Sequence, residues 1–107
     1  MIKSLKHREE YIMTIKEKIM NYLEKNFDGR VLLIVDGEPH LYHDNSTLCY
    51  KMTELFELWA SGNEVVEYQD PIKLFDYCLE THDFGAICDL YYEDSSGDFC
   101  FERPYDL

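Results

Sequence analysis

The chain of 107 residues is long enough for one domain with one core and too short for two. Hydrophobic residues make up 46% of it and aromatic residues 15%, which excludes a chain that stays disordered. The net charge of −12 is unevenly placed: residues 1–30 hold seven Lys or Arg against five Asp or Glu, and residues 31–107 hold three against seventeen. Such an acidic body repels phosphate and anionic lipid, which disfavours direct binding to nucleic acid or to a membrane.

The opening residues are charged throughout, and no segment approaches the roughly 18 uncharged apolar residues of a membrane-spanning helix. We therefore expect a cytoplasmic protein. The four cysteines show no C-x-x-C pairing, so neither a zinc ribbon nor a redox motif is indicated. Reduced, mostly buried thiols are expected at Cys49, Cys78, Cys88 and Cys100.

A first helix is predicted near the N-terminus, where apolar residues recur every three or four positions: Ile12, Ile15, Ile19, Leu23 and Phe27. Thr14 and Glu17 have the spacing of a capping box, which places the helix start after Thr14 and makes residues 1–12 an optional extension. Residues 8–12 can be encoded by codons containing AGGAG, the purine run that bacterial ribosomes use before a start codon. We therefore expect Met13 to be the native start of a bacterial or phage gene.

The next elements are a hairpin and a second helix. Residues 30–35 are β-branched and aliphatic, Asp36-Gly37 is a turn signal, and residues 40–43 return as the second strand with Pro39 near its beginning. Residues 44–46 end that strand and cap a helix that stops at Gly62. The apolar stripe of this helix is Leu48, Met52, Leu55, Phe56 and Trp59.

The second half begins with residues 64–68, which are short and β-prone and are predicted as a strand. Asp70-Pro71 starts a third helix that runs to about His82, Gly85 breaks the pattern, and residues 86–92 and 98–102 form a closing hairpin around the turn at 94–97. The predicted fold is α+β: a single domain, residues 1–107, of order α-β-β-α-β-α-β-β, with an antiparallel sheet covered by helices.

Two groups of residues have the chemistry of an enzyme. His40, His43 and Asp44 are suitable ligands for zinc or another divalent ion, but strand positions 40 and 43 point to opposite faces unless the chain turns there. Cys78 and His82 lie four apart on the third predicted helix, so they would share a face as a thiol and a base. A small metal-dependent or thiol-dependent enzyme is therefore an alternative, although two partly exposed histidines at a strand end and a buried, inert thiol beside a core histidine are the simpler interpretation.

No motif of high specificity indicates a cofactor. The five glycines are isolated and form neither G-x-G-x-x-G nor a P-loop, and pairs of carboxylates are too abundant to indicate acid–base catalysis. We expect no cofactor and no catalytic residue, and we expect the protein not to be an enzyme.

The acidic residues themselves indicate a partner. Residues 64–107 hold twelve Asp or Glu against two Lys or Arg, interleaved with aromatic residues. Such a surface can serve solubility alone, but carboxylates beside tyrosines can also occupy a basic groove shaped for phosphates. The expected contact residues are Glu64, Glu67, Asp70, Glu93, Asp94, Asp98 and Glu102, with Tyr68, Tyr91 and Tyr92 as aromatic anchors.

In size and charge the chain is similar to small acidic inhibitors of phages and mobile elements, such as anti-CRISPR and anti-restriction proteins that imitate DNA. This similarity is one of class, and it implies a non-enzymatic inhibitor that binds a nucleic-acid-handling protein. Immunity proteins that neutralise a basic nuclease toxin have the same features. A structural or regulatory homo-oligomer is a third possibility.

Overall fold

The computed structural model describes residues 13–28, 30–94 and 96–102, so the expected extension, residues 1–12, lies outside it. The described helices are α2 (Ile15–Asn26), α3 (Asn45–Ser61), α4 (Pro71–Thr81) and the short 3-10 helix η1 (Val66–Gln69). The strands β1 (Val31–Val35), β2 (Glu38–Tyr42), β3 (Asp89–Glu93) and β4 (Phe99–Glu102) form one antiparallel sheet of order β2-β1-β3-β4. The predicted α+β class is confirmed.

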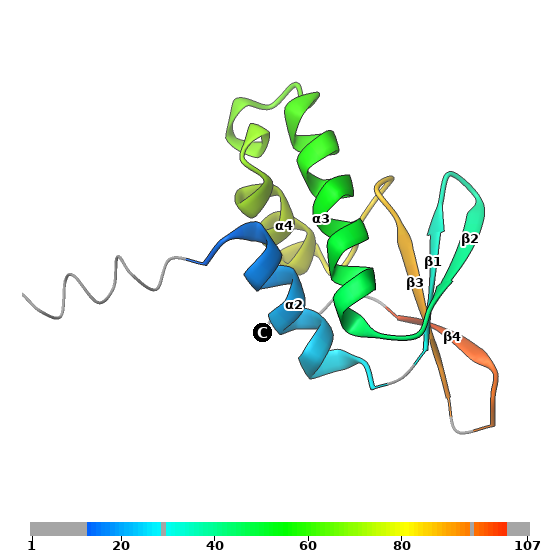
Figure 1. Ribbon diagram of the computed structural model, residues 1–107. Helices are drawn as coiled ribbons and strands as arrows, with labels where there is room; N and C mark the ends of the chain where they lie inside the picture. Colours follow the sequence, from blue (N-terminus) through cyan, green and yellow to red (C-terminus); the bar gives the residue numbers. More distant parts are fainter. Residues whose placement is uncertain (1–12, 29, 95, 103–107) are drawn as a thin grey trace, which may run out of the picture.

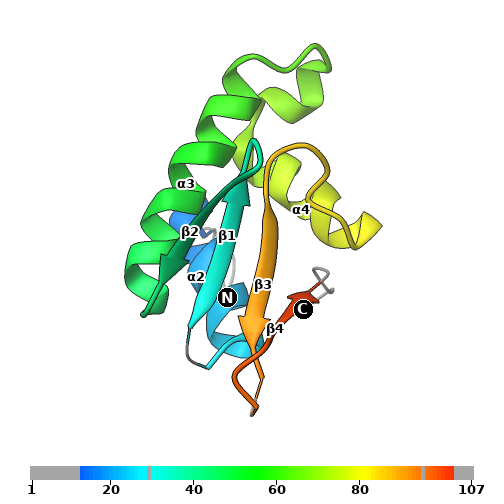
Figure 2. The same ribbon diagram turned by 90° about the vertical axis from the view of Figure 1, so that its right-hand side faces the viewer.

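The molecule has two layers, because α2, α3 and α4 all lie against the same face of the sheet (Figure 1). Val31 and Leu33 of β1 pair with Tyr92 and Leu90 of β3, and their side chains point to the helices. Figure 2 looks onto the other face of the sheet, which none of the described helices covers.

Aromatic rings fill the space between the helices. Phe75 of α4 meets Phe56 of α3 edge to face, with ring centres 5.1 Å apart, and stacks on Phe84 at 6.1 Å. Tyr22 of α2 makes edge-to-face contacts with both Phe75 and Phe84. These geometries are favourable for aromatic pairs, so the three helices are held by one interlocked cluster.

The helices begin at capping residues that can be recognised in the sequence. The backbone N–H of Glu17 donates to Thr14 Oγ1, and the N–H of Thr14 donates to the Glu17 carboxylate, which confirms the capping box. Asp44 accepts from Thr47 N at 2.8 Å and caps α3. Asp70 accepts from Ile72 N at 2.9 Å and caps α4.

The hairpin between β1 and β2 turns at Asp36 and Gly37, whose φ angles are +53° and +80°. Two successive positive φ angles are the requirement of the tightest hairpin turn, which glycine and aspartate tolerate. β2 is an edge strand, so Pro39 removes no hydrogen bond from the interior of the sheet.

Three predictions about elements need correction. Residues 64–68 do not form a strand, because Asn63 closes a tight turn by accepting from Val65 N and from Gln69 Nε2, and η1 follows. The strand predicted from residue 86 begins only at Asp89. Trp59 is 40% exposed, while Ala60 beside it is buried, so the buried face of α3 ends at Ala60 and does not include Trp59.

A helix that could span a membrane is not found among the described residues, because none is both long enough and apolar enough.

Candidate partner-binding surface

A large local excess of negative charge lies in residues 54–83, here named the acidic helical end. This segment comprises the second half of α3, η1 and α4, which meet at one end of the molecule (Figure 1). It contains eight Asp or Glu and one lysine, Lys73. The eight carboxylates are those of Glu54, Glu57, Glu64, Glu67, Asp70, Asp76, Glu80 and Asp83.

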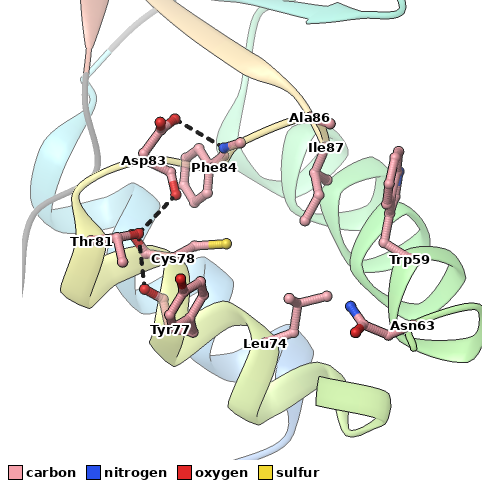
Figure 3. A pocket seen from close by; sticks show the side chains of 11 residues that line it. Trp59, Asn63, Leu74, Tyr77, Cys78, Thr81, Asp83, Phe84, Ala86 and Ile87 are labelled. Atoms are coloured by element: carbon pink, nitrogen blue, oxygen red, sulfur yellow. Dashed lines mark hydrogen bonds between the residues drawn. The ribbon is translucent and has the colours of Figure 1, made fainter. Parts of the chain in front are cut away.

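A pocket of about 390 Å³ opens between α3, α4 and the segment that follows α4. Figure 3 shows Trp59 of α3 facing Tyr77 and Cys78 of α4 across the hollow, with the Cys78 sulfur pointing into it. Leu74, Phe84 and Ile87 complete an apolar wall. An opening of this size and polarity accommodates an apolar or aromatic side chain, or a small molecule.

Two polar side chains that line this pocket, Thr81 and Asp83, are engaged in local hydrogen bonds. Thr81 Oγ1 donates to the backbone carbonyl oxygen of Tyr77 at 3.1 Å, and Asp83 Oδ1 accepts from Gly85 N at 2.9 Å (Figure 3). These bonds fix the segment after α4, where Gly85 has a φ of +65°. The pocket therefore offers shape and apolar surface more than hydrogen bonds.

A second hollow of about 240 Å³ shares Tyr77 with the first pocket. It is lined by the Tyr68–Tyr77 pair, whose ring centres are 4.8 Å apart, and by the charged side chains of Glu67, Lys73, Asp76 and Glu80. Burial raises the pKa of Tyr68, and the charges of Glu67 and Glu80 raise it further. Asp76 is paired with Lys18 of α2 at 2.7 Å, so the remaining charged groups of this hollow are the carboxylates of Glu67 and Glu80 and the ammonium group of Lys73.

Large apolar side chains are unusually exposed in the same segment. Val66 is 77% exposed, Tyr77 is 45% exposed, and Leu58, Val65 and Trp59 are also exposed. Single exposed apolar residues are ordinary, but several beside a pocket and a ring of carboxylates are typical of a protein-binding surface. Aromatic anchors such as Trp59 and Tyr77 provide much of the affinity of such surfaces.

The acidic residues predicted as one contact set divide into two groups. Glu64, Glu67 and Asp70 belong to the acidic helical end. Glu93, Asp94 and Asp98 flank the turn between β3 and β4, which lies at the opposite end of the molecule in both views (Figures 1 and 2). The two groups therefore do not form one continuous face.

Two carboxylates of the second group are engaged within the molecule. Arg30 holds Glu93 through two contacts, one of them from Nε at 2.9 Å, and this lowers the pKa of Glu93. Asp94 Oδ1 accepts from Ser96 N, Ser96 Oγ and Asp98 N, and these bonds lower the pKa of Asp94. Asp98 is exposed, and the side chain of Glu102 lies outside the described residues.

The three predicted aromatic anchors lie in three different environments. Tyr68 is half-buried at the acidic helical end, against Tyr77. Tyr92 is half-buried on the helix-facing side of β3, where its ring is 6.4 Å from that of Phe27. Tyr91 lies on the opposite side of β3, on the sheet face without helices. Of the three, only Tyr68 belongs with Glu64, Glu67 and Asp70.

The histidine string does not assemble a metal site. His40 lies on β2 opposite Leu33, His43 follows the end of that strand, and the Asp44 carboxylate caps α3. The Asp44 carboxylate accepts hydrogen bonds from the backbone N–H and the hydroxyl group of Thr47, and these bonds lower the pKa of Asp44. Among residues 13–28, 30–94 and 96–102, no three His, Cys, Asp or Glu side chains gather closely enough to hold a metal ion.

Cys78 and His82 do not share a helix face as predicted, because α4 ends at Thr81 and His82 takes a left-handed conformation with φ +57°. Burial raises the pKa of the Cys78 thiol to about 12. At neutral pH this thiol is protonated, and a protonated thiol is a poor nucleophile. The same side chain fits its observed place as an apolar wall of the pocket.

No protein-family model, curated protein or solved structure matches the chain, so the surface is interpreted from its own geometry. Sequence reasoning missed Trp59 and Tyr77 as surface residues and missed the part of α4 that lines the second hollow. A signal was present, because Lys73, Asp76, Tyr77 and Glu80 stand at positions i, i+3, i+4 and i+7 of one helix face, opposite the apolar face of α4.

Proposed function

We propose that this protein is a small acidic binding protein that occupies the basic groove of a nucleic-acid-handling protein, and that the acidic helical end makes the contact. The observation that carries the proposal is that eight carboxylates, of which Glu54 and Asp76 are paired with Lys51 and Lys18, lie in the same segment as exposed Trp59 and Tyr77 and two hollows. Charge supplies long-range attraction, and the hollows supply places where partner side chains can be held.

The physical roles of the two components differ. Exposed carboxylates accelerate encounter with a basic surface and contribute little each once contact is made, roughly 0.2–1 kcal/mol. An arginine or lysine from the partner can place its charged end beside Glu67 and Glu80 and its stem on the Tyr68–Tyr77 pair. An apolar partner side chain fits the pocket walled by Trp59, Leu74 and Phe84.

The test compares two variants with the same change in net charge. The triple variant Glu64→Gln, Glu67→Gln, Asp70→Asn removes three charges from the acidic helical end, and asparagine keeps the cap of α4. The control variant Glu24→Gln, Asp36→Asn, Glu38→Gln removes three exposed charges elsewhere. Each protein is immobilised, exposed to bacterial lysate at low salt, and eluted with rising salt or with duplex DNA.

The expected result is capture of a nucleic-acid-binding protein by the native protein and by the control variant. Duplex DNA should compete with that capture, and the triple variant should bind about tenfold more weakly, mainly through a lower association rate. Binding that resists both salt and DNA would contradict the proposal. Equal losses in both variants would show that net charge matters and the acidic helical end does not.

A further inference from the structure

The sheet face that none of the described helices covers forms a second surface, whose chemistry differs from that of the acidic helical end. Its residues are fixed by the register: Leu32 lies between Leu41 and Tyr91, Ile34 lies between Pro39 and Asp89, and Glu93 lies opposite Phe99. We name this set, together with Arg30, the outer sheet face; it faces the viewer in Figure 2. Leu41 is 41% exposed and Phe99 is 37% exposed.

Charge is nearly balanced on this surface. Arg30 and Glu93 neutralise each other at one end of the sheet, and Asp89 stands near the other end of β3. Between them lie the apolar side chains of Leu32, Ile34, Leu41, Tyr91 and Phe99. In a chain with a net charge of −12, this is a surface on which a second acidic molecule can approach with little local repulsion.

The size of the face limits the strength of any contact. Four strands about 4.8 Å apart and about five residues long cover roughly 19 by 16 Å, or roughly 300 Å² in projection. A standard protein interface buries roughly 800 Å² on each partner. The outer sheet face is smaller, which fits a weak and concentration-dependent association rather than an obligate one.

Symmetry favours a second copy as the occupant. Two sheets pack face to face about 10 Å apart, with strands nearly aligned. A two-fold axis across the strands lays β1 on β1 and brings the Arg30 end of one sheet over the Asp89 end of the other. The apolar centre then meets itself, and each Arg30 lies near an added carboxylate. A basic partner finds no comparable excess of negative charge on this face.

We propose that the outer sheet face is a self-association surface, on which two copies of the chain pack sheet against sheet. The helices lie on the far side of each sheet, so both acidic helical ends stay exposed in the dimer (Figure 1). Because the acidic bodies repel each other while the contact is apolar, added salt strengthens this association. Salt weakens the binding of a basic partner, so the two surfaces respond in opposite directions.

The test is sedimentation equilibrium of the native protein over about 10 μM to 1 mM, in NaCl from about 50 to 500 mM. We expect a monomer–dimer equilibrium whose dissociation constant falls severalfold as salt rises. Leu41→Lys places an ammonium group in the apolar contact of both copies and should weaken dimerisation at least about tenfold. Circular dichroism checks that the variant is folded, and Leu41 lies on an edge strand where a lysine is tolerated.

The matched control is Val66→Lys, which adds the same charge at an exposed apolar position of the acidic helical end. It should leave the dimer intact or strengthen it slightly, because it lowers the net repulsion. A protein that stays monomeric at every salt concentration would overturn the proposal. A dimer that Val66→Lys disrupts and Leu41→Lys spares would overturn it as well.

Discussion

The acidic helical end and the outer sheet face are both exposed, but they combine charge and apolar area differently. At the helical end, carboxylates surround Trp59, Tyr77 and two hollows. On the sheet, apolar side chains form a shallow layer between a neutralised ion pair and Asp89. The net charge of the chain is therefore an average over two unlike surfaces. Added salt distinguishes them, because it screens the attraction between the acidic helical end and a basic partner but reduces the repulsion between two acidic copies that pair through their outer sheet faces.

The largest expected effect is a loss of stability, and it distinguishes a core residue of α4, Phe75, from a surface residue of the same helix, Tyr77. Phe75→Ala removes a fully buried ring from the aromatic cluster and should lower the free energy of unfolding by about 3–5 kcal/mol. Tyr77→Ala, two residues on, should cost little stability and reduce partner binding severalfold. Urea unfolding and partner binding are measured on both variants. Comparable stability losses in the two would show that Tyr77 belongs to the core rather than to the surface.

A smaller effect concerns the buried thiol of the pocket. The pKa of Cys78 is raised to about 12 in the folded state, whereas an unfolded thiol titrates near 8.5. Stability from the protonated thiol is complete below the unfolded pKa and is lost as pH rises toward the folded one. The free energy of unfolding should fall by about 1–2 kcal/mol between about pH 8 and pH 10 through this group.

Cys78→Ala should remove that part of the alkaline decline, and urea unfolding at several pH values measures it. Cys100→Ala is the comparison on the sheet, where the thiol is only half-buried and its pKa is raised mainly by its hydrogen bond to Asp94. A decline that is unchanged in the Cys78 variant would contradict the buried, protonated thiol.

The smallest effect concerns the hairpin that carries Phe99. Asp94→Ala removes the acceptor of three hydrogen bonds in the β3–β4 turn, so β4 should fray and dimerisation should weaken a few fold. The pKa of Asp94 is lowered, so its contribution is present above the unfolded pKa and is lost as pH falls through the folded one. Amide exchange and sedimentation report the two changes.

Partner binding at the acidic helical end should be unaffected by Asp94→Ala. Asp98→Asn is the control for the turn, because it removes a nearby charge and leaves the three bonds to Asp94 in place. If partner binding falls together with dimerisation, the two surfaces are not independent.

Elements set by local chemistry were predictable from the sequence. The capping box at Thr14 and Glu17, the Asp70-Pro71 helix start and the Asp36-Gly37 turn each depend on residues close together in the chain. The prediction of a strand at residues 64–68 was wrong, because it depended on the β propensity of Val65 and Val66. In the structure, Asn63 and Gln69 close a turn there instead. Strand propensity of this kind depends strongly on context.

The candidate site was harder to predict, for a different reason. Its pocket is walled by residues from α3, α4 and the segment 83–87, and only the packing of the three brings them together. Composition indicated that acidic residues mattered, but it could not show that Glu93 and Asp94 serve an ion pair and a turn. Charge is visible in a sequence, whereas the local engagement of each carboxylate becomes visible only in three dimensions.

The position of Trp59 has a practical consequence. It is the one tryptophan of the chain, and it lies 40% exposed in the wall of the pocket, while the aromatic residues of the described core are phenylalanine and tyrosine. Excitation at the red edge of the absorption band therefore selects the acidic helical end. A partner that fills the pocket should shift the emission to shorter wavelengths, whereas sheet-to-sheet pairing should leave the spectrum nearly unchanged. One unlabelled sample thus distinguishes occupancy of the two surfaces.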